Sequence, residues 1–167
     1  MGCDCHIYLE ITINNGRKWC ADHHHIEETS SGYYYSLSMW RDYELFGRLA
    51  DVRGYHRKNK SPKGLPQNVS DVVIKAHIYW GQDAHSASYM SLRSFYIVLK
   101  DLGYDKEEPG MPYQEPFDYP NNSYTNIQLI NIVKYCDILK MQLMMDQVLM
   151  GKKVSDIRFR LVYFFDS

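Results

Sequence analysis

Hydrophobic and polar side chains alternate along the first residues of the chain. One set is Cys3, Cys5, Ile7 and Leu9, and the other is Asp4, His6, Tyr8 and Glu10. Successive side chains of a strand point to opposite faces, so residues 3–13 are predicted to form a strand. Its apolar face suits a core. Its ionisable face is either ordinary half-exposed surface or one wall of a binding site.

Further strands are predicted along the chain. The turn signal Asn-Asn-Gly-Arg at 14–17 indicates a hairpin, with residues 18–25 as the returning strand. Residues 33–40 alternate weakly and suggest a third strand, and residues 155–166 form the last one. Residues 81–90 are predicted to be irregular or a short strand.

Helices are predicted where apolar residues recur every three or four positions. The four segments are 41–52, 70–80, 91–103 and 125–150, with Ser70 and Ser91 as N-caps of the second and third. The last segment is apolar over more than half its circumference, so we expect it to be the central core helix. Its methionines at 141, 144, 145 and 150 are expected to fill gaps in that core.

The order of elements, with strands at both ends and helices between, predicts an α+β fold. We expect one domain over all 167 residues, with a small antiparallel or mixed sheet that includes both terminal strands and packs on the helix at 125–150. The terminal strands are expected to pair, because Asp4 and Glu10 on one are natural cross-strand partners of Arg158 and Arg160 on the other.

Composition narrows the classes of partner. The net charge is −1, so no global field attracts nucleic acid, and no apolar run approaches the roughly 18 residues of a membrane span. The chain has no recognisable signal peptide, and its four cysteines lack a framework spacing, which favours free thiols in the cytoplasm. The fifteen tyrosines are suited to core margins or to contacts with ligands and partners.

An Asp-x-His spacing occurs twice, at Asp4–His6 and at Asp83–His85. A carboxylate beside an imidazole orients the ring and raises its basicity, which serves general acid–base catalysis or metal binding. We expect residues 83–88 to approach the polar face that carries Asp4 and His6. The alternative is a chance repeat in a chain with seven histidines.

Basic residues gather in the segment 53–63, which holds five Lys or Arg and no acid. Arg41 and Arg48 are seven residues apart and would share nearly one face of the predicted helix. Together with Arg53 they suit a small anionic ligand better than a nucleic-acid track. The lysines of the segment, which are Lys58, Lys60 and Lys63, are explained as solvated surface.

The cysteines and histidines allow a zinc site in principle, from Cys3, Cys5, Cys20 and His23. However, Cys3 and Cys5 lie on the apolar face of the first strand, where free cysteine packs as a small hydrophobic residue. Buried thiols are therefore favoured, and no resident metal or cofactor is predicted.

Five stretches occur together in one order: MGCDCHIYLE, RDYELFGRLADVR, PKGLP, DAHSASY and VYFFDS. In this combination the chain resembles a family of small, mostly uncharacterised proteins of bacteriophages and prophages. The resemblance implies a phage origin and a role in the cytoplasm of the host cell during infection. It supplies no catalytic residues. By analogy, phage accessory proteins of this size sequester or cleave nucleotide immune signals.

These residue types suit a pocket for a phosphorylated, base-containing ligand, because Arg binds phosphate, Tyr stacks, and Asp or Ser reads ribose and base edges. The predicted ligand-binding residues are Asp4, Tyr8, Arg41, Asp42, Arg48, Arg53, Asp83, Ser86 and Ser88. The first hypothesis is a homo-oligomeric protein that sequesters an ADP-ribose or cyclic nucleotide signal and so blocks host defence signalling.

Two alternatives belong to other classes. The first is a phosphodiesterase in which His6 and His85 act as general acid and base, or hold a divalent metal together with Asp4 and Asp83. The second is a protein–protein inhibitor that blocks a host factor through its aromatic surface.

Overall fold

The computed structural model describes residues 2–21, 37–38, 41–52, 62–104 and 126–167. The predicted ligand residue Arg53 lies outside these residues, as does His23, a member of the zinc set that the sequence disfavours. The elements are β1 (Asp4–Thr12), β2 (Cys20–Ala21), β3 (Leu37–Ser38), α1 (Tyr43–Ala50), α2 (Asp71–Trp80), a short 3-10 helix η3 (Gly81–Asp83), β4 (His85–Ser91), α3 (Leu92–Asp101), α4 (Asn126–Leu149) and β5 (Arg158–Asp166).

The strands form one antiparallel sheet in the order β2-β1-β5-β4, and β3 also pairs with β1. The two terminal strands β1 and β5 pair along their whole length, from Asp4 opposite Asp166 to Thr12 opposite Arg158. The predicted α+β fold and the predicted pairing of the terminal strands are therefore confirmed. The predicted charge pairing holds for Glu10, which lies opposite Arg160, whereas Asp4 faces a second carboxylate.

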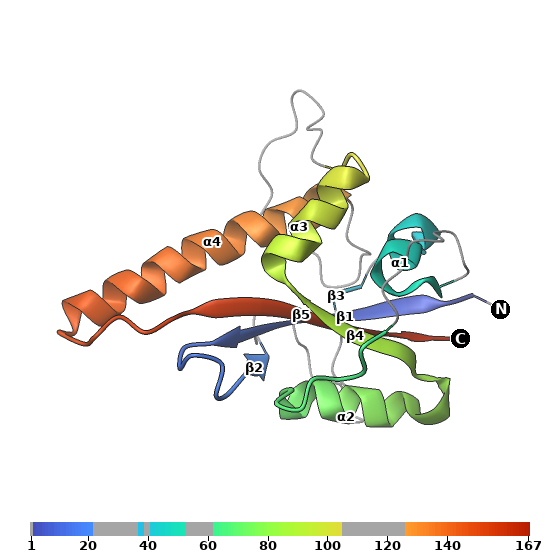
Figure 1. Cartoon of the computed structure of the whole chain (residues 1–167), viewed down its shortest axis with the longest axis horizontal. Helices are drawn as coiled ribbons and strands as arrows, with labels where there is room; N and C mark the ends of the chain where they lie inside the picture. Colours follow the sequence, from blue (N-terminus) through green and yellow to red (C-terminus); the bar gives the residue numbers. More distant parts are fainter. Residues whose placement is uncertain (1, 22–36, 39–40, 53–61, 105–125) are drawn as a thin grey trace.

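Helices cover both faces of the sheet (Figure 1). α1, α3 and α4 lie on one side, over a core that includes the predicted apolar face of β1. α2 lies on the other side, where Val73 and Ala76 pack on Tyr8, Val162 and Phe164. The polar face of β1 is therefore largely covered, and the expectation of a half-exposed strand is wrong for Tyr8, which is 1% exposed.

Local chemistry explains where the helices begin. α1 starts at Tyr43, two residues later than predicted, because Asp42 takes the N-cap position and its carboxylate accepts a hydrogen bond from Leu45 N. In α3 the Ser91 hydroxyl accepts from Ser94 N, as an N-cap does. Ser70 occupies the N-cap position of α2, but its hydroxyl makes no capping bond.

The predicted helix at 125–150 is α4, and the side chains described as buried in it all lie in its first half. Ile130, Ile132 and Cys136 are buried in the main core. Beyond them the helix extends past α3 (Figure 1), and the four methionines are 37% to 71% exposed. The expectation that these methionines fill gaps in the core is wrong.

Candidate functional site

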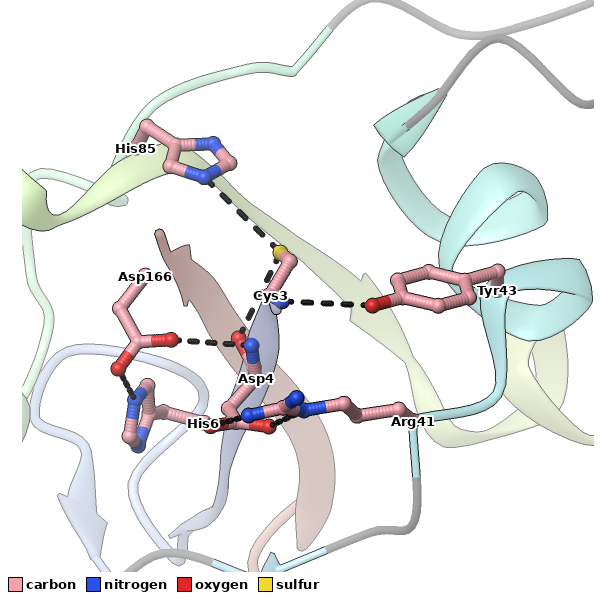
Figure 2. A network of polar contacts seen from close by, with 7 residues as sticks. All are labelled: Cys3, Asp4, His6, Arg41, Tyr43, His85 and Asp166. Atoms are coloured by element: carbon pink, nitrogen blue, oxygen red, sulfur yellow. Dashed lines mark hydrogen bonds and ion pairs between the residues drawn. The ribbon is translucent and has the colours of Figure 1, made fainter. Parts of the chain in front are cut away.

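The start of β1 and the end of β5 carry a network of polar side chains (Figure 2). One oxygen of the Asp166 carboxylate accepts a hydrogen bond from Asp4 N at 2.9 Å, and the other lies 3.3 Å from His6 Nε2. The carboxylate partner of His6 is therefore Asp166 rather than Asp4. Sequence reasoning missed Asp166, although antiparallel pairing of the two terminal strands would have placed it opposite Asp4.

Asp4 is held by Arg41, which precedes α1. The Arg41 guanidinium donates from Nε at 2.7 Å and from Nη2 at 3.2 Å to the two carboxylate oxygens of Asp4. This hydrogen-bonded ion pair lowers the pKa of Asp4. A Cβ atom at Gly2 would lie 1.9 Å from Arg41 Nη1, so a larger residue at position 2 would displace the exposed guanidinium from its present place. The two predicted ligand residues thus serve first as partners for each other.

His85, the second predicted catalytic histidine, lies near Cys3. Its Nε2 is 4.0 Å from the Cys3 sulfur, and its Nδ1 is 3.0 Å from the hydroxyl of Ser86. The ring stacks on Phe165, its cross-strand neighbour, with 6.1 Å between ring centroids. Because Phe165 and Cys3 belong to the main core, His85 lies on the face covered by α1, α3 and α4.

His6 lies on the opposite face of the sheet. Its ring is 4.8 Å from the ring of Trp80 in α2 and 5.0 Å from that of Phe164. The structure therefore does not bring His6 and His85 to one substrate phosphate, because the sheet lies between them. The expectation that residues 83–88 join the polar face of Asp4 and His6 is wrong for His85 and for Ser88, which pairs with Tyr163 of the main core.

The remaining predicted ligand residues are dispersed. Asp42 caps α1 and accepts a hydrogen bond from the hydroxyl of Tyr104, while Arg48 pairs with Asp101 at 3.3 Å. Asp83 is exposed in η3. Burial of Tyr104, together with its hydrogen bond to Asp42, raises the pKa of the Tyr104 hydroxyl. These residues do not form one anion-binding site.

A pH dependence follows from His6. Its burial lowers the pKa of the ring from the ordinary value of 6.5, and the hydrogen bond to Asp166 opposes this effect only in part. The unfolded chain therefore takes up the proton more readily, so stability should fall as the pH drops below about 6.5. Chemical denaturation between pH 7.5 and 5 should show a smaller loss in His6→Gln than in the wild type. Parallel losses in the two proteins would rule out His6 as the cause.

A second candidate site is an open pocket of about 480 Å³ on the α2 side of the sheet. Its lining comes from the segment before α2, from β4 and from β5. The residues are Lys63, Leu65, Pro66, Gln67, Asn68, Tyr89 and Arg160. A volume of this size falls within the roughly 300–1,000 Å³ typical of small-molecule sites.

Arg160 is fixed at the base of this pocket by a buried ion pair. Its Nε donates to Glu10 Oε2 at 2.6 Å, and both side chains are 9% exposed or less. Nη1 and Nη2 donate to the side-chain and main-chain oxygens of Asn68 at 2.9 and 3.0 Å. Trp19 covers the guanidinium at 4.0 Å. Among the described residues these bonds use three of the five N–H donors of Arg160, which leaves two for a ligand.

Tyr89 gives the pocket an aromatic wall. Lys63 Nζ lies 4.9 Å from the ring centroid and the Arg160 guanidinium 6.0 Å from it. Lys63 Nζ also donates to the main-chain oxygen of Tyr89 at 3.4 Å. Because Lys63 is exposed, its ammonium group can exchange this contact for one to a bound anion. Among the described residues, the lining offers cationic, amide and aromatic groups and no Asp, Glu, His or Cys.

Sequence reasoning assigned none of these pocket residues to a ligand. Lys63 was explained as solvated surface, and Arg160 as a counter-ion of the first strand, which it also is. The available signal was the PKGLP stretch, whose lysine, leucine and second proline line the pocket.

Comparisons with known proteins do not name a family: no family model, no curated protein and no solved structure matches the chain. In the part of the chain that the structure describes, no group of three His, Cys, Asp or Glu side chains could hold a metal ion. Within the same residues no helix is long and apolar enough to cross a membrane.

Proposed function

We propose that this protein binds and sequesters a small nucleotide-derived anion in the pocket beside Tyr89. The observation that carries the proposal is the placement of two cationic side chains, Lys63 and Arg160, next to one aromatic ring in a pocket of about 480 Å³. A phosphorylated ligand with a planar base needs both kinds of contact. Gln67 and Asn68 add amide groups that can pair with base edges.

The size of the pocket suits one nucleotide unit. A larger signal, such as ADP-ribose or a cyclic oligonucleotide, would place one base and one phosphate in the pocket and leave the remainder at its open mouth. This assignment moves the ligand away from Arg41 and Arg48, which already pair with carboxylates.

Sequestration is favoured over cleavage because the described residues of the pocket supply cationic, amide and aromatic groups, which suit binding. The phosphodiesterase alternative needs His6 and His85 on one substrate, and they lie on opposite faces of the sheet. The resemblance to phage proteins supplies the setting that we propose, which is removal of a defence signal from the host cytoplasm during infection.

The direct experiment is calorimetry with a panel of nucleoside monophosphates, cyclic nucleotides and ADP-ribose derivatives. The proposal expects binding of at least one compound, followed by its recovery intact after the protein is heat-denatured. No binding across the panel would overturn the assignment of the pocket. Recovery of a cleaved compound instead of the intact ligand would mean that the protein hydrolyses the ligand and does not sequester it.

Two substitutions locate the ligand. Tyr89→Leu should weaken binding by about 10-fold or more, because stacking of one base on an aromatic side chain contributes roughly 1–3 kcal/mol. Lys63→Ala should weaken binding similarly and reduce its dependence on salt, because one phosphate contact is lost. The matched control is Lys100→Ala, which removes the same charge from an exposed position on α3. Equal losses in the two lysine variants would place the ligand elsewhere.

A further inference from the structure

The second half of α4 carries a stripe of apolar side chains that points into solvent. Ile138, Met141, Met145 and Val148 are 50%, 71%, 64% and 59% exposed. Leu139 and Leu143, on the opposite side of the same helix, are partly buried against the main core. The helix therefore has one apolar face toward the body of the protein and a second, outward one.

The outward stripe has the spacing of a helix-pairing seam. Its members follow one another at intervals of three, four and three residues, which is the a and d pattern of a heptad repeat. A helix that is apolar on both sides is ordinarily buried on both sides. The stripe is therefore a surface suited to a second helix.

The end of α4 is held firmly in place, so the stripe is presented outward. Gln147 Oε1 accepts a hydrogen bond from Ser155 N at 2.7 Å, and Gln147 Nε2 donates to Ser155 Oγ at 3.0 Å. Asp156 N, one residue further, donates to Asn15 in the turn after β1. The link between α4 and β5 is thus tied to the helix and to the sheet.

We propose that the occupant of this stripe is the same stripe of a second copy of the chain, with the two α4 helices antiparallel about a two-fold axis. The spacing is self-complementary. With the axis midway between Met141 and Met145, Met141 of one copy faces Met145 of the other. The same axis places Ile138 of one copy opposite Val148 of the other. Two-fold contacts of this kind are the commonest in soluble homo-oligomers.

Charge and area agree with this arrangement. Gln142 and Met144, which meet their own copies at the axis, are uncharged, so no like charges face each other there. Asp137 comes beside the end of the partner helix, where Lys152 and Lys153 follow. With Leu149, the exposed fractions of the stripe correspond to about 600 Å² per chain, hence about 1,200 Å² per pair, the lower limit of a stable interface.

The first test is the oligomeric state of the full chain by sedimentation equilibrium over a concentration series. The wild type should be dimeric at micromolar concentration, and Met145→Glu should weaken the dimer by about 100-fold or more, because association would bury two unpaired carboxylates. The matched control is Ile78→Glu, an equally exposed position on α2, which should leave the dimer unchanged. A monomeric wild type overturns the proposal, as does a dimer that Met145→Glu leaves intact.

The second test determines the direction of the helices. In a Cys20→Ser background, which removes the exposed thiol, Gln142→Cys should form an intermolecular disulfide across the axis under oxidation. Ile138→Cys should not, because the antiparallel arrangement separates it from its own copy. A disulfide in Ile138→Cys and none in Gln142→Cys would show that the two helices are parallel, which contradicts the proposed arrangement. If Met145→Glu lowers the melting temperature of a monomeric protein, the stripe is covered by the chain itself and the proposal fails.

Discussion

Replacing Glu10 by Ala is expected to lower the free energy of unfolding by about 3–5 kcal/mol, the range found when a buried ion pair loses one partner. Glu10 is 0% exposed and has two roles. One carboxylate oxygen receives Nε of Arg160 at 2.6 Å, and the other accepts a hydrogen bond from Ser70 N at 2.7 Å. The variant would therefore bury an unpaired guanidinium and leave the amide of Ser70, the N-cap residue of α2, without its acceptor.

Urea denaturation of the wild type, Glu10→Ala and Asp83→Ala measures this effect. Asp83 is an exposed carboxylate in η3, and its removal should change stability by less than about 0.5 kcal/mol. A loss below about 1 kcal/mol in Glu10→Ala would contradict this expectation and mean that the Arg160 guanidinium reaches solvent or another partner once Glu10 is removed.

A double replacement separates stability from binding. Glu10→Leu with Arg160→Met exchanges the ion pair for apolar side chains of similar volume, which in other proteins is often close to neutral for stability. Ser70 N remains without its acceptor, so recovery should be partial. The same variant should weaken binding of the proposed ligand, because Arg160 is one of two cationic side chains among the described residues of the pocket. Binding at wild-type affinity would exclude Arg160 from recognition.

The alternation of side chains predicted the sheet because its cause is local: a strand with a two-residue period has to bury one face. The pairing of β1 with β5 was predicted from opposite charges on the two strands, and Glu10 does lie opposite Arg160. It did not show that α2 covers the second face. The same alternation of polar and apolar residues results whether the polar face is solvated or covered by a segment that supplies hydrogen-bond partners. Here Ser70 N, at the start of α2, donates to Glu10.

The error over α4 has a related cause. A helix with apolar residues all round is predicted to be buried, and sequence periodicity does not distinguish burial within one chain from burial between two chains. Met141 and Met145 therefore suggested a core that the described residues do not provide.

The candidate site was the least predictable part. The two Asp-x-His spacings are identical in sequence, yet His6 and His85 lie on opposite faces. His6 lies opposite Phe164 and His85 opposite Phe165, and these neighbouring residues of β5 point to opposite sides of the sheet. A β-bulge at Ser86 and Ala87 further shifts the register of β4 after His85. The pocket residues Lys63, Tyr89 and Arg160 are brought together only by the fold, so no motif spacing could have grouped them.

Removing the Asp166 carboxylate should have the second largest effect, a loss of about 2–3 kcal/mol in Asp166→Ala. The carboxylate is largely buried and serves both Asp4 N and His6, and an unsatisfied buried polar group costs roughly 1–3 kcal/mol. Because Asp166 raises the pKa of His6, its loss should lower that pKa further and make the loss of stability below pH 6.5 steeper. Chemical denaturation at pH 7.5 and 5.5 measures both effects.

The control is Asp156→Ala. The exposed carboxylate of Asp156 pairs with Arg158 at the opposite end of β5, so its removal should change the free energy of unfolding little. Equal losses in the two variants, with the same pH dependence, would show that Asp166 is not what joins the ends of β1 and β5.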